Sequence, residues 1–161
     1  MNIVFLDVDG VLVYNDYENL STFDIDIEKV KLLKEICDKT NSSVVISSSW
    51  REYHGNHSSC YTILRNILNA NGIDVIDDTP YIEPKLEDLI YFKVKHGTGR
   101  AAEIQKWIKD NSPDNFVILD DEDFDWKDYG YDNHWVRPTW FGDGGLQREH
   151  VDKAIEILSM K

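Results

Sequence analysis

The stretch NIVFLDVDGVL, residues 2–12, opens the chain and decides its fold. It begins with a short apolar run over residues 2–6, and such a run suits a strand that is buried on both faces of a parallel sheet. The run stops abruptly at Asp7-Val8-Asp9-Gly10. Because glycine adopts a left-handed backbone without strain, Gly10 can turn the chain so that the carbonyl and the carboxyl group of Asp9 face one site. The stretch therefore predicts a central strand that delivers two acids at its end.

Apolar residues along the rest of the chain alternate between helical spacing and short strand-like runs. They predict helices over 26–39, 61–68, 101–108 and 151–158, and further strands over 43–47, 73–76, 116–119 and 134–136. Residues 77–98 carry mixed polarity, and we expect a loop there with one helical turn around 86–90. The order β-α-β-α-β-α-β-β-α predicts a three-layer, Rossmann-like α/β fold, doubly wound around a parallel sheet of about five strands.

Length and charge limit the function classes. The 161 residues fit a single domain, 1–161, and 17 Lys and Arg against 30 Asp and Glu give a net charge of −13. Such a surface repels polyanions, which argues against a broad nucleic-acid footprint but leaves room for one phosphorylated end in a local positive pocket. An excess of carboxylates suits a hard cation such as Mg²⁺. The chain shows no signal peptide or membrane span, so we expect a cytoplasmic protein. Cys37 and Cys60 are expected to be reduced packing residues.

Acids and hydroxyls gather where three predicted strands end: Asp7 and Asp9 after the first, residues 47–49 after the second, and Asp120-Asp121 after a later one. Ligands of parallel α/β sheets bind at these carboxyl ends. Asp7 and Asp9 point the same way in an extended chain, and two like charges so close call for a cation or a shared proton. A solvated turn would give a similar pattern. A calcium loop is disfavoured, because no ladder of acids follows at its twelve-residue spacing.

These motifs resemble a known family. Residues 5–12 (FLDVDGVL) resemble the first motif of haloacid dehalogenase (HAD) phosphatases, residues 44–48 (VVISS) the second, and residues 117–121 (VILDD) the fourth. A closer resemblance covers nearly the whole chain, and it is to the small HAD domains of bacterial and phage RNA-repair proteins. The segments that carry this closer resemblance are 48–50, 99–108, 118–121 and 145–155. The short connections imply a minimal cap or none, so the site would admit bulky substrates or require a closing partner or oligomer.

The resemblance implies a phosphoaspartyl mechanism with Mg²⁺. Asp7 would be the nucleophile, and Asp9 would act as general acid and then general base. Mg²⁺ would be held by the Asp7 carboxylate, the Asp9 backbone carbonyl and an acid at 120–121. The family pattern favours Asp121 as the primary metal ligand, with Asp120 acting indirectly or through water.

A hydroxyl and a cation are expected to bind the phosphoryl oxygens. Ser48 is the favoured hydroxyl, with Ser47 as its rival, because strand alternation lets only one of them point into the site. Arg100 is the favoured cation, with Lys95 as its rival, since the arginine fork suits a phosphate.

Other polar residues are interpreted as structural. We expect surface roles for His54 and His57, and a solvated loop for the acids at 122, 123 and 125. For Trp50 we favour packing over stacking against a substrate.

The sequence therefore predicts a Mg²⁺-dependent phosphomonoester hydrolase whose substrate is a phosphorylated small molecule, a nucleotide or a nucleic-acid end. The alternative is a phosphate- or partner-binding module that keeps the fold without catalysis, although such a module has no need for Asp9. A receiver-like signalling domain is a third interpretation, and the same second acid argues against it.

Overall fold

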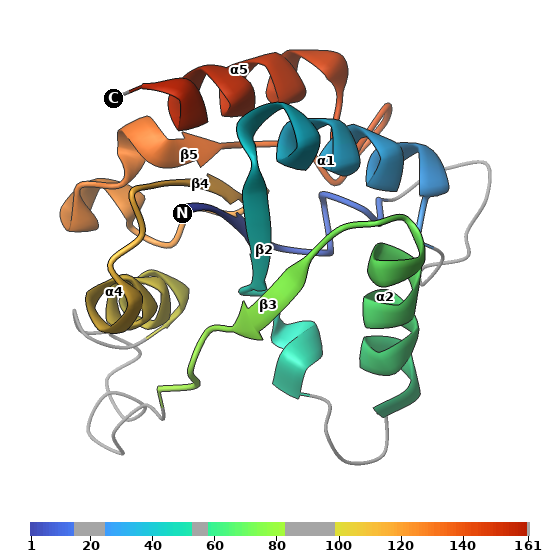
Figure 1. Cartoon of the computed structure of the whole chain (residues 1–161). Coiled ribbons are helices and arrows are strands. Elements are labelled where there is room, and N and C mark those ends of the chain that lie inside the picture. The colour runs from blue at the N-terminus through green and yellow to red at the C-terminus, as the bar shows by residue number, and fades with distance from the viewer. Residues whose placement is uncertain (15–24, 53–57, 83–98, 161) are drawn as a thin grey trace.

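The computed structural model describes residues 1–14, 25–52, 58–82 and 99–160 (Figure 1). Five parallel strands form one sheet in the order β3-β2-β1-β4-β5. The strands are β1 (Asn2–Leu6), β2 (Ser42–Ile46), β3 (Val75–Asp78), β4 (Asn115–Leu119) and β5 (Trp135–Val136). The strand order reverses at β1, and this switch point is where doubly wound sheets bind their ligands.

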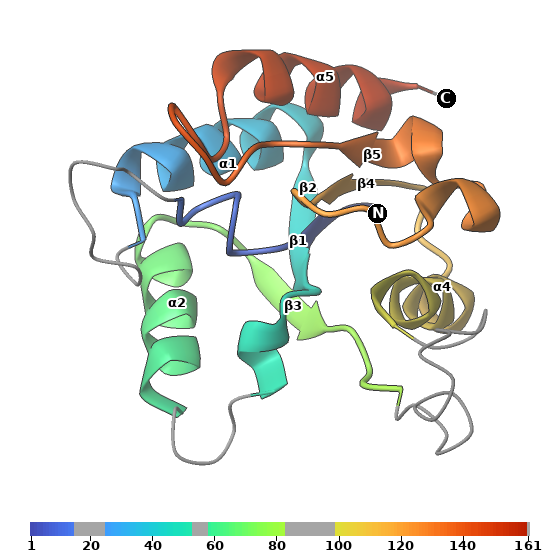
Figure 2. The same ribbon diagram turned by 180° about the vertical axis from the view of Figure 1, so that it is seen from behind.

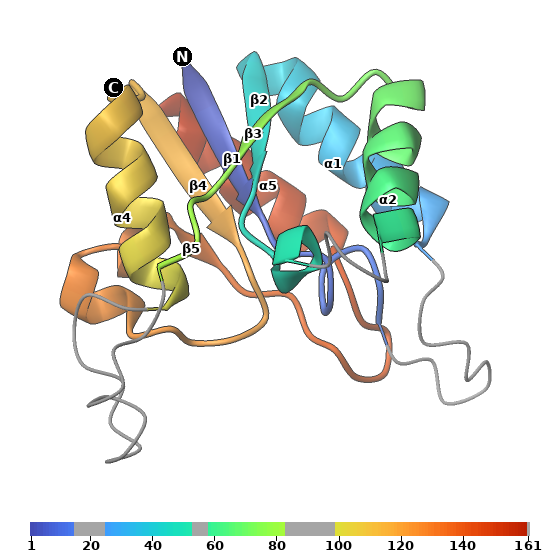
Figure 3. The same cartoon turned by 90° about the horizontal axis from the view of Figure 1, so that it is seen from below.

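Helices lie on both faces of the sheet (Figures 1 and 2). Helices α1 (Ile27–Thr40) and α5 (Arg148–Ser159) pack side by side on one face. Helix α4 (Arg100–Asn111) covers the other face together with the short 3-10 helices η2 (Trp126–Tyr129) and η3 (Asp132–His134). Helix α2 (Ser58–Ala70) lies beside β3 and η1 (Ser49–Glu52), as the view from below shows (Figure 3). The predicted three-layer, doubly wound fold is confirmed.

The central strand is buried on both of its faces. Val4 and Leu6 join the core under α1 and α5, whereas Ile3 and Phe5 join a second core under α4. None of these four side chains is exposed to solvent. Each fully buried side chain of this size contributes about 1.5–3 kcal/mol to folding, which explains why the run 2–6 shows no polar alternation.

Register places the functional strand ends at one level. Leu6 lies opposite Ile46 on β2 and opposite Leu119 on β4. The residues that follow these three, Asp7, Ser47 and Asp120, therefore leave the sheet side by side. This edge contains the switch point and carries the candidate site.

Most predicted elements are confirmed with small shifts of their ends. Strand β1 has its predicted bounds, and β2 ends at Ile46, one residue earlier than predicted. The short 3-10 helices were not predicted. The helical turn predicted around 86–90 lies outside the described residues, as do residues 15–24 and 53–57, so the minimal cap stays a prediction. Cys37 and Cys60 are free thiols, as expected. Among the described residues, no helix combines the length and the apolar character needed to cross a bilayer.

Candidate active site

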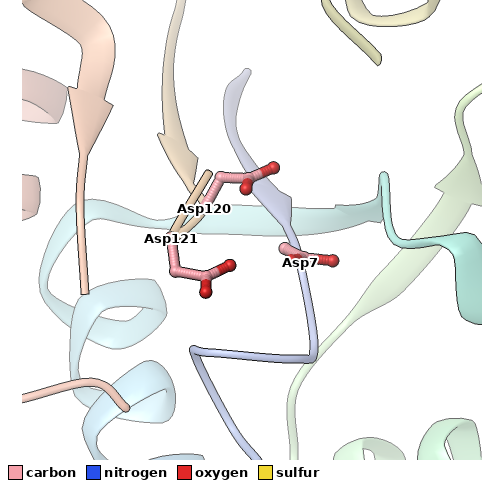
Figure 4. Close-up of side chains that lie close together, drawn as sticks. All are labelled: Asp7, Asp120 and Asp121. Carbon is pink, nitrogen blue, oxygen red and sulfur yellow. The ribbon is translucent and has the colours of Figure 1, made fainter. Parts of the chain in front are cut away.

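Three carboxylates converge where β1 and β4 end. Asp7, Asp120 and Asp121 each offer an oxygen, and these atoms all lie within 4.8 Å of one another. Figure 4 shows Asp7 coming from the end of β1 and the other two from the end of β4. The Asp7 backbone N–H donates to the Leu119 carbonyl at 2.9 Å, so the ladder between these strands continues into the site. The structure therefore brings Asp7 together with Asp120 and Asp121 at one sheet edge, as predicted.

Arg100 is the cation that these acids share. It is the first residue of α4, and its Nη1 lies 3.1 Å from Asp7 Oδ2 and 2.6 Å from Asp120 Oδ2. Its guanidinium also lies over the Phe124 ring, 4.5 Å from the ring centre. Only 13% of the side chain is exposed, so these contacts take place largely away from water. Arg100 is thus brought into the site as predicted, whereas its rival Lys95 lies outside the described residues.

One arginine does not compensate all the acids. Burial, followed by the negative charges of Asp7 and Glu122, raises the pKa of Asp121 to about 6. The pKa of Asp120 is also raised, first by burial and then by Asp7, although Arg100 opposes both effects. Both burial and neighbouring negative charge disfavour an ionised carboxylate, and a bound cation opposes both effects. The site is therefore electrostatically suited to a further cation.

A cavity of about 430 Å³ opens in front of these groups. Its lining combines acidic and aromatic side chains with one arginine and one serine, and consists of Asp7, Asp9, Ser49, Arg100, Asp121, Glu122, Trp140 and Phe141. Of the two β4 acids, Asp121 lines the cavity, whereas Asp120 is completely buried and accepts a hydrogen bond from the Glu122 backbone N–H at 3.0 Å. Asp121 is thus the acid of this pair that a ligand in the cavity can reach.

Gly10 holds the acid loop against Asp121. Its φ of 76° lies in the left-handed region, as the sequence predicted. A Cβ atom at this position would stand 2.1 Å from Asp121 Cγ, far inside contact distance. The Gly10 N–H also donates to the Val13 carbonyl at 2.7 Å, which closes the turn. The glycine is required both by its backbone conformation and by the close approach of an active-site carboxylate.

Asp9 is half-buried and lines the same cavity. The Trp50 indole Nε1–H donates to Asp9 Oδ2 at 2.9 Å. Burial raises the pKa of Asp9, the Trp50 hydrogen bond lowers it, and the charge of Asp7 raises it again. Trp50 is 5% exposed and belongs to the hydrophobic core, which confirms the expectation that it packs. Its hydrogen bond to Asp9 was not anticipated.

The hydroxyls at the end of β2 divide between core and cavity. Ser48 is fully buried, and its Oγ accepts a hydrogen bond from the Trp50 backbone N–H at 3.3 Å. Ser47 Oγ is also buried and has no hydrogen-bond partner among the described residues. Ser49 is the serine that lines the cavity. The assignment of Ser48 as the phosphate ligand therefore stays a prediction. Ser49, which strand alternation did not indicate, is a second candidate for this hydroxyl.

Some of the remaining sequence interpretations concern residues that the structure describes, and others do not. Glu122 is exposed as expected, yet it contributes to the cavity wall. Trp140 and Phe141, on the segment between β5 and α5, were not predicted to belong to the site. His54 and His57 lie outside the described residues.

A buried ion pair supports the loop after β2. Arg51 and Glu103 are each 5% exposed and pair directly, which joins η1 to α4. Arg51 Nη1 also donates to the carbonyls of Ser47, at 2.6 Å, and Ser48, at 2.7 Å. Because Glu103 lies one turn after Arg100 on the same helix, this pair fixes the serine loop relative to the arginine of the site.

Comparison with known proteins agrees with this geometry. A family model described as "HAD domain in Swiss Army Knife RNA repair proteins" matches residues 3–151. No curated protein and no solved structure gave a match. Apart from Asn2, the matched range contains all the strands of the sheet, together with the carboxylate cluster, Arg100 and the cavity. The chain therefore belongs to the family of HAD domains found in Swiss Army Knife RNA repair proteins.

Proposed function

We propose that this protein is a Mg²⁺-dependent phosphomonoester hydrolase that forms a phosphoaspartyl intermediate on Asp7. The observation that carries the proposal is the cluster of Asp7, Asp120 and Asp121 around Arg100, in front of a cavity and inside a HAD domain. A HAD domain supports a phosphatase-like role, and the charge of the cluster supports the binding of a phosphate together with a cation.

The donor set fits a divalent cation. Mg²⁺ prefers hard oxygen ligands, and it usually binds through one or two carboxylates together with substrate phosphates. Asp7 and Asp121 offer carboxylate oxygens on the cavity wall, and the Asp9 backbone carbonyl would complete the protein ligands. Asp120, which is buried and paired with Arg100, would act on the metal indirectly or through water. When bound, Mg²⁺ would neutralise charge so that the anionic phosphate can approach the Asp7 carboxylate.

The residues of the chain can carry both steps. In the first, an Asp7 carboxylate oxygen attacks phosphorus, the bond to the leaving oxygen breaks, and Asp9 donates a proton to that oxygen. In the second, Asp9 takes a proton from a water molecule, which attacks phosphorus and releases Asp7 and inorganic phosphate. Arg100 holds a phosphoryl oxygen throughout, because its guanidinium already lies beside Asp7.

The proposed substrate is a nucleotide or a polynucleotide end. The printed description of the family refers to RNA repair, and the cavity offers the aromatic side chains of Trp140 and Phe141. Aromatic rings stack on nucleobases of any sequence, which suits an end-processing enzyme. The net charge of −13 opposes long contacts with a nucleic acid and favours recognition of the terminus alone.

The proposal is tested by a phosphatase screen in Mg²⁺ with p-nitrophenyl phosphate, nucleotides, and oligonucleotides phosphorylated at the 5′ or 3′ end. Asp7→Asn and Asp9→Asn should each abolish turnover, whereas Glu156→Gln, an exposed acid on α5, should retain it. Ser48→Ala and Ser49→Ala, assayed side by side, separate the two candidate hydroxyls.

Activity that survives Asp7→Asn would exclude this residue as the nucleophile. Wild-type protein that binds Mg²⁺ but turns over none of the substrates would favour the alternative, a binding module that keeps the HAD fold.

A further inference from the structure

Trp50 approaches the candidate acid/base from the core side. It is the second residue of η1, and its ring packs in the same core as Val8 and Leu12 from the acid loop. Its Nε1–H lies 2.9 Å from Asp9 Oδ2. The other carboxylate oxygen, Oδ1, has no hydrogen-bond partner anywhere in the part of the chain that the structure describes. The two oxygens of Asp9 are therefore not equivalent.

The chemistry of the indole makes this asymmetry consequential. An indole N–H can donate a hydrogen bond but cannot accept one. The hydroxyl oxygen of a protonated carboxyl group is a poorer acceptor than the carbonyl oxygen, so the hydrogen bond from Trp50 to Oδ2 is stronger when the proton is on Oδ1. The hydrogen bond therefore favours Oδ1 as the proton carrier in neutral Asp9.

The donor is held rigidly. The Ser48 hydroxyl accepts a hydrogen bond from the Trp50 backbone N–H, and the next residue, Arg51, is anchored to the carbonyls of Ser47 and Ser48 and to Glu103. A catalytic group works well only when its supporting contacts fix it within about 0.5 Å.

We propose that Trp50 is a positioning residue for Asp9: its indole N–H holds Oδ2, so that Oδ1 carries the proton that is donated to the leaving group. This inference rests on the proposed phosphatase function. It adds a residue that does not touch the substrate but determines which atom of Asp9 does.

The test compares two substrates of nearly equal size. The leaving group of p-nitrophenyl phosphate departs readily without protonation, whereas that of phenyl phosphate resembles a tyrosine side chain, with a pKa of about 10, and needs the acid. Trp50→Phe keeps an aromatic ring in the core but removes the indole N–H and part of the bicyclic ring, so its control must lose the same volume. We expect kcat for phenyl phosphate to fall about 10- to 100-fold, a part of the usual effect of general acid catalysis, while KM stays the same. For p-nitrophenyl phosphate kcat should fall less than about threefold.

Trp107→Phe is the matched control. Trp107 is 3% exposed, and its Nε1–H donates to Asp77 Oδ2 at 2.7 Å, which makes it a second buried indole bound to a carboxylate. It does not line the cavity. This variant should change kcat for both substrates by the same factor, even if it lowers the stability of the protein. In single-turnover experiments, adding Trp50→Phe to Asp9→Asn should not change further the ratio of the rates of phosphoryl transfer from the two substrates, because both changes act on the same proton.

The outcomes separate the two proposals. Wild-type turnover of both substrates with an equal loss of both in Trp50→Phe, or with no loss, would overturn the positioning role and leave the phosphatase proposal standing. A wild-type protein that hydrolyses neither these two substrates nor the nucleotides and oligonucleotides of the screen would overturn both.

Discussion

Replacing Glu103 by alanine should weaken the whole domain and the site together. Glu103 forms a buried ion pair with Arg51, and its Oε1 also accepts a hydrogen bond from the Ile82 backbone N–H at 3.1 Å. The variant leaves a guanidinium that is 5% exposed without its carboxylate. Removing one partner of a buried pair costs about 3–5 kcal/mol, because the remaining buried charge loses an attraction that offset its desolvation.

This cost is large relative to the total. The free energy of unfolding of a domain is about 5–15 kcal/mol, and for a chain of this size each kcal/mol that is lost lowers Tm by about 2–4 °C. We therefore expect Tm, measured by circular dichroism, to fall by about 6–20 °C. The free energy of unfolding, measured by urea denaturation, should fall by the cost of the broken ion pair. Phosphatase activity at a temperature below the new transition should also fall, because α4 carries Arg100.

An exposed ion pair on the same helix provides the control. Lys106 and Asp110 are 53% and 58% exposed, and pairs of this kind contribute less than about 1 kcal/mol. Asp110→Ala should therefore leave Tm nearly unchanged. If Glu103→Ala destabilised the protein no more than Asp110→Ala does, the assignment of Arg51 and Glu103 as the link between the serine loop and α4 would be wrong.

Three further predictions concern the site. Gly10→Ala should cost about 1–2 kcal/mol in urea unfolding for its left-handed backbone alone, and should also abolish activity because the new Cβ displaces Asp121. Without divalent cations, stability should fall as the pH rises from about 4 to about 6, because the folded pKa of Asp121 is raised to about 6 and the folded state keeps a proton that the unfolded chain releases. Asp121→Asn should reduce this slope in thermal melts with a chelator, and an unchanged slope would argue against Asp121 as its source. Phe141→Ala should leave Tm unchanged, because the ring is 59% exposed, yet lower kcat/KM for nucleotides about 5- to 100-fold relative to acetyl phosphate.

The fold was predictable because its signals are local. The run before Asp7 is apolar because both faces of β1 are buried, and such a run can be recognised in the sequence alone, so β1 has the predicted bounds. The order of strands and helices then places the acids of 7 and 120–121 at one sheet edge. Arg100 was found because it opens a recognisable helix just before the β4 acids.

The details of the site depended on tertiary contacts. Strand alternation could not rank the serines, because the chain leaves the extended conformation after Ile46 and enters a 3-10 helix at Ser49. The bond from Trp50 to Asp9 spans 41 positions, and no local pattern indicates it. Trp140 and Phe141 reach the cavity from a segment without helix or strand periodicity. The different exposure of Asp120 and Asp121 also depends on tertiary packing, which buries Asp120 against Arg100.

Trapping the phosphoenzyme tests the central claim most directly. Asp9→Asn should still let p-nitrophenyl phosphate transfer its phosphoryl group to Asp7, since this leaving group needs no acid, but should slow the breakdown that requires a general base. After a rapid acid quench in the presence of Mg²⁺, intact-protein mass spectrometry should show one added phosphoryl group, and peptide mapping should locate it on Asp7. The added mass should be absent when Asp7→Asn is combined with Asp9→Asn. Release of p-nitrophenol without a phosphoenzyme, or a phosphoryl group on another residue, would contradict the account.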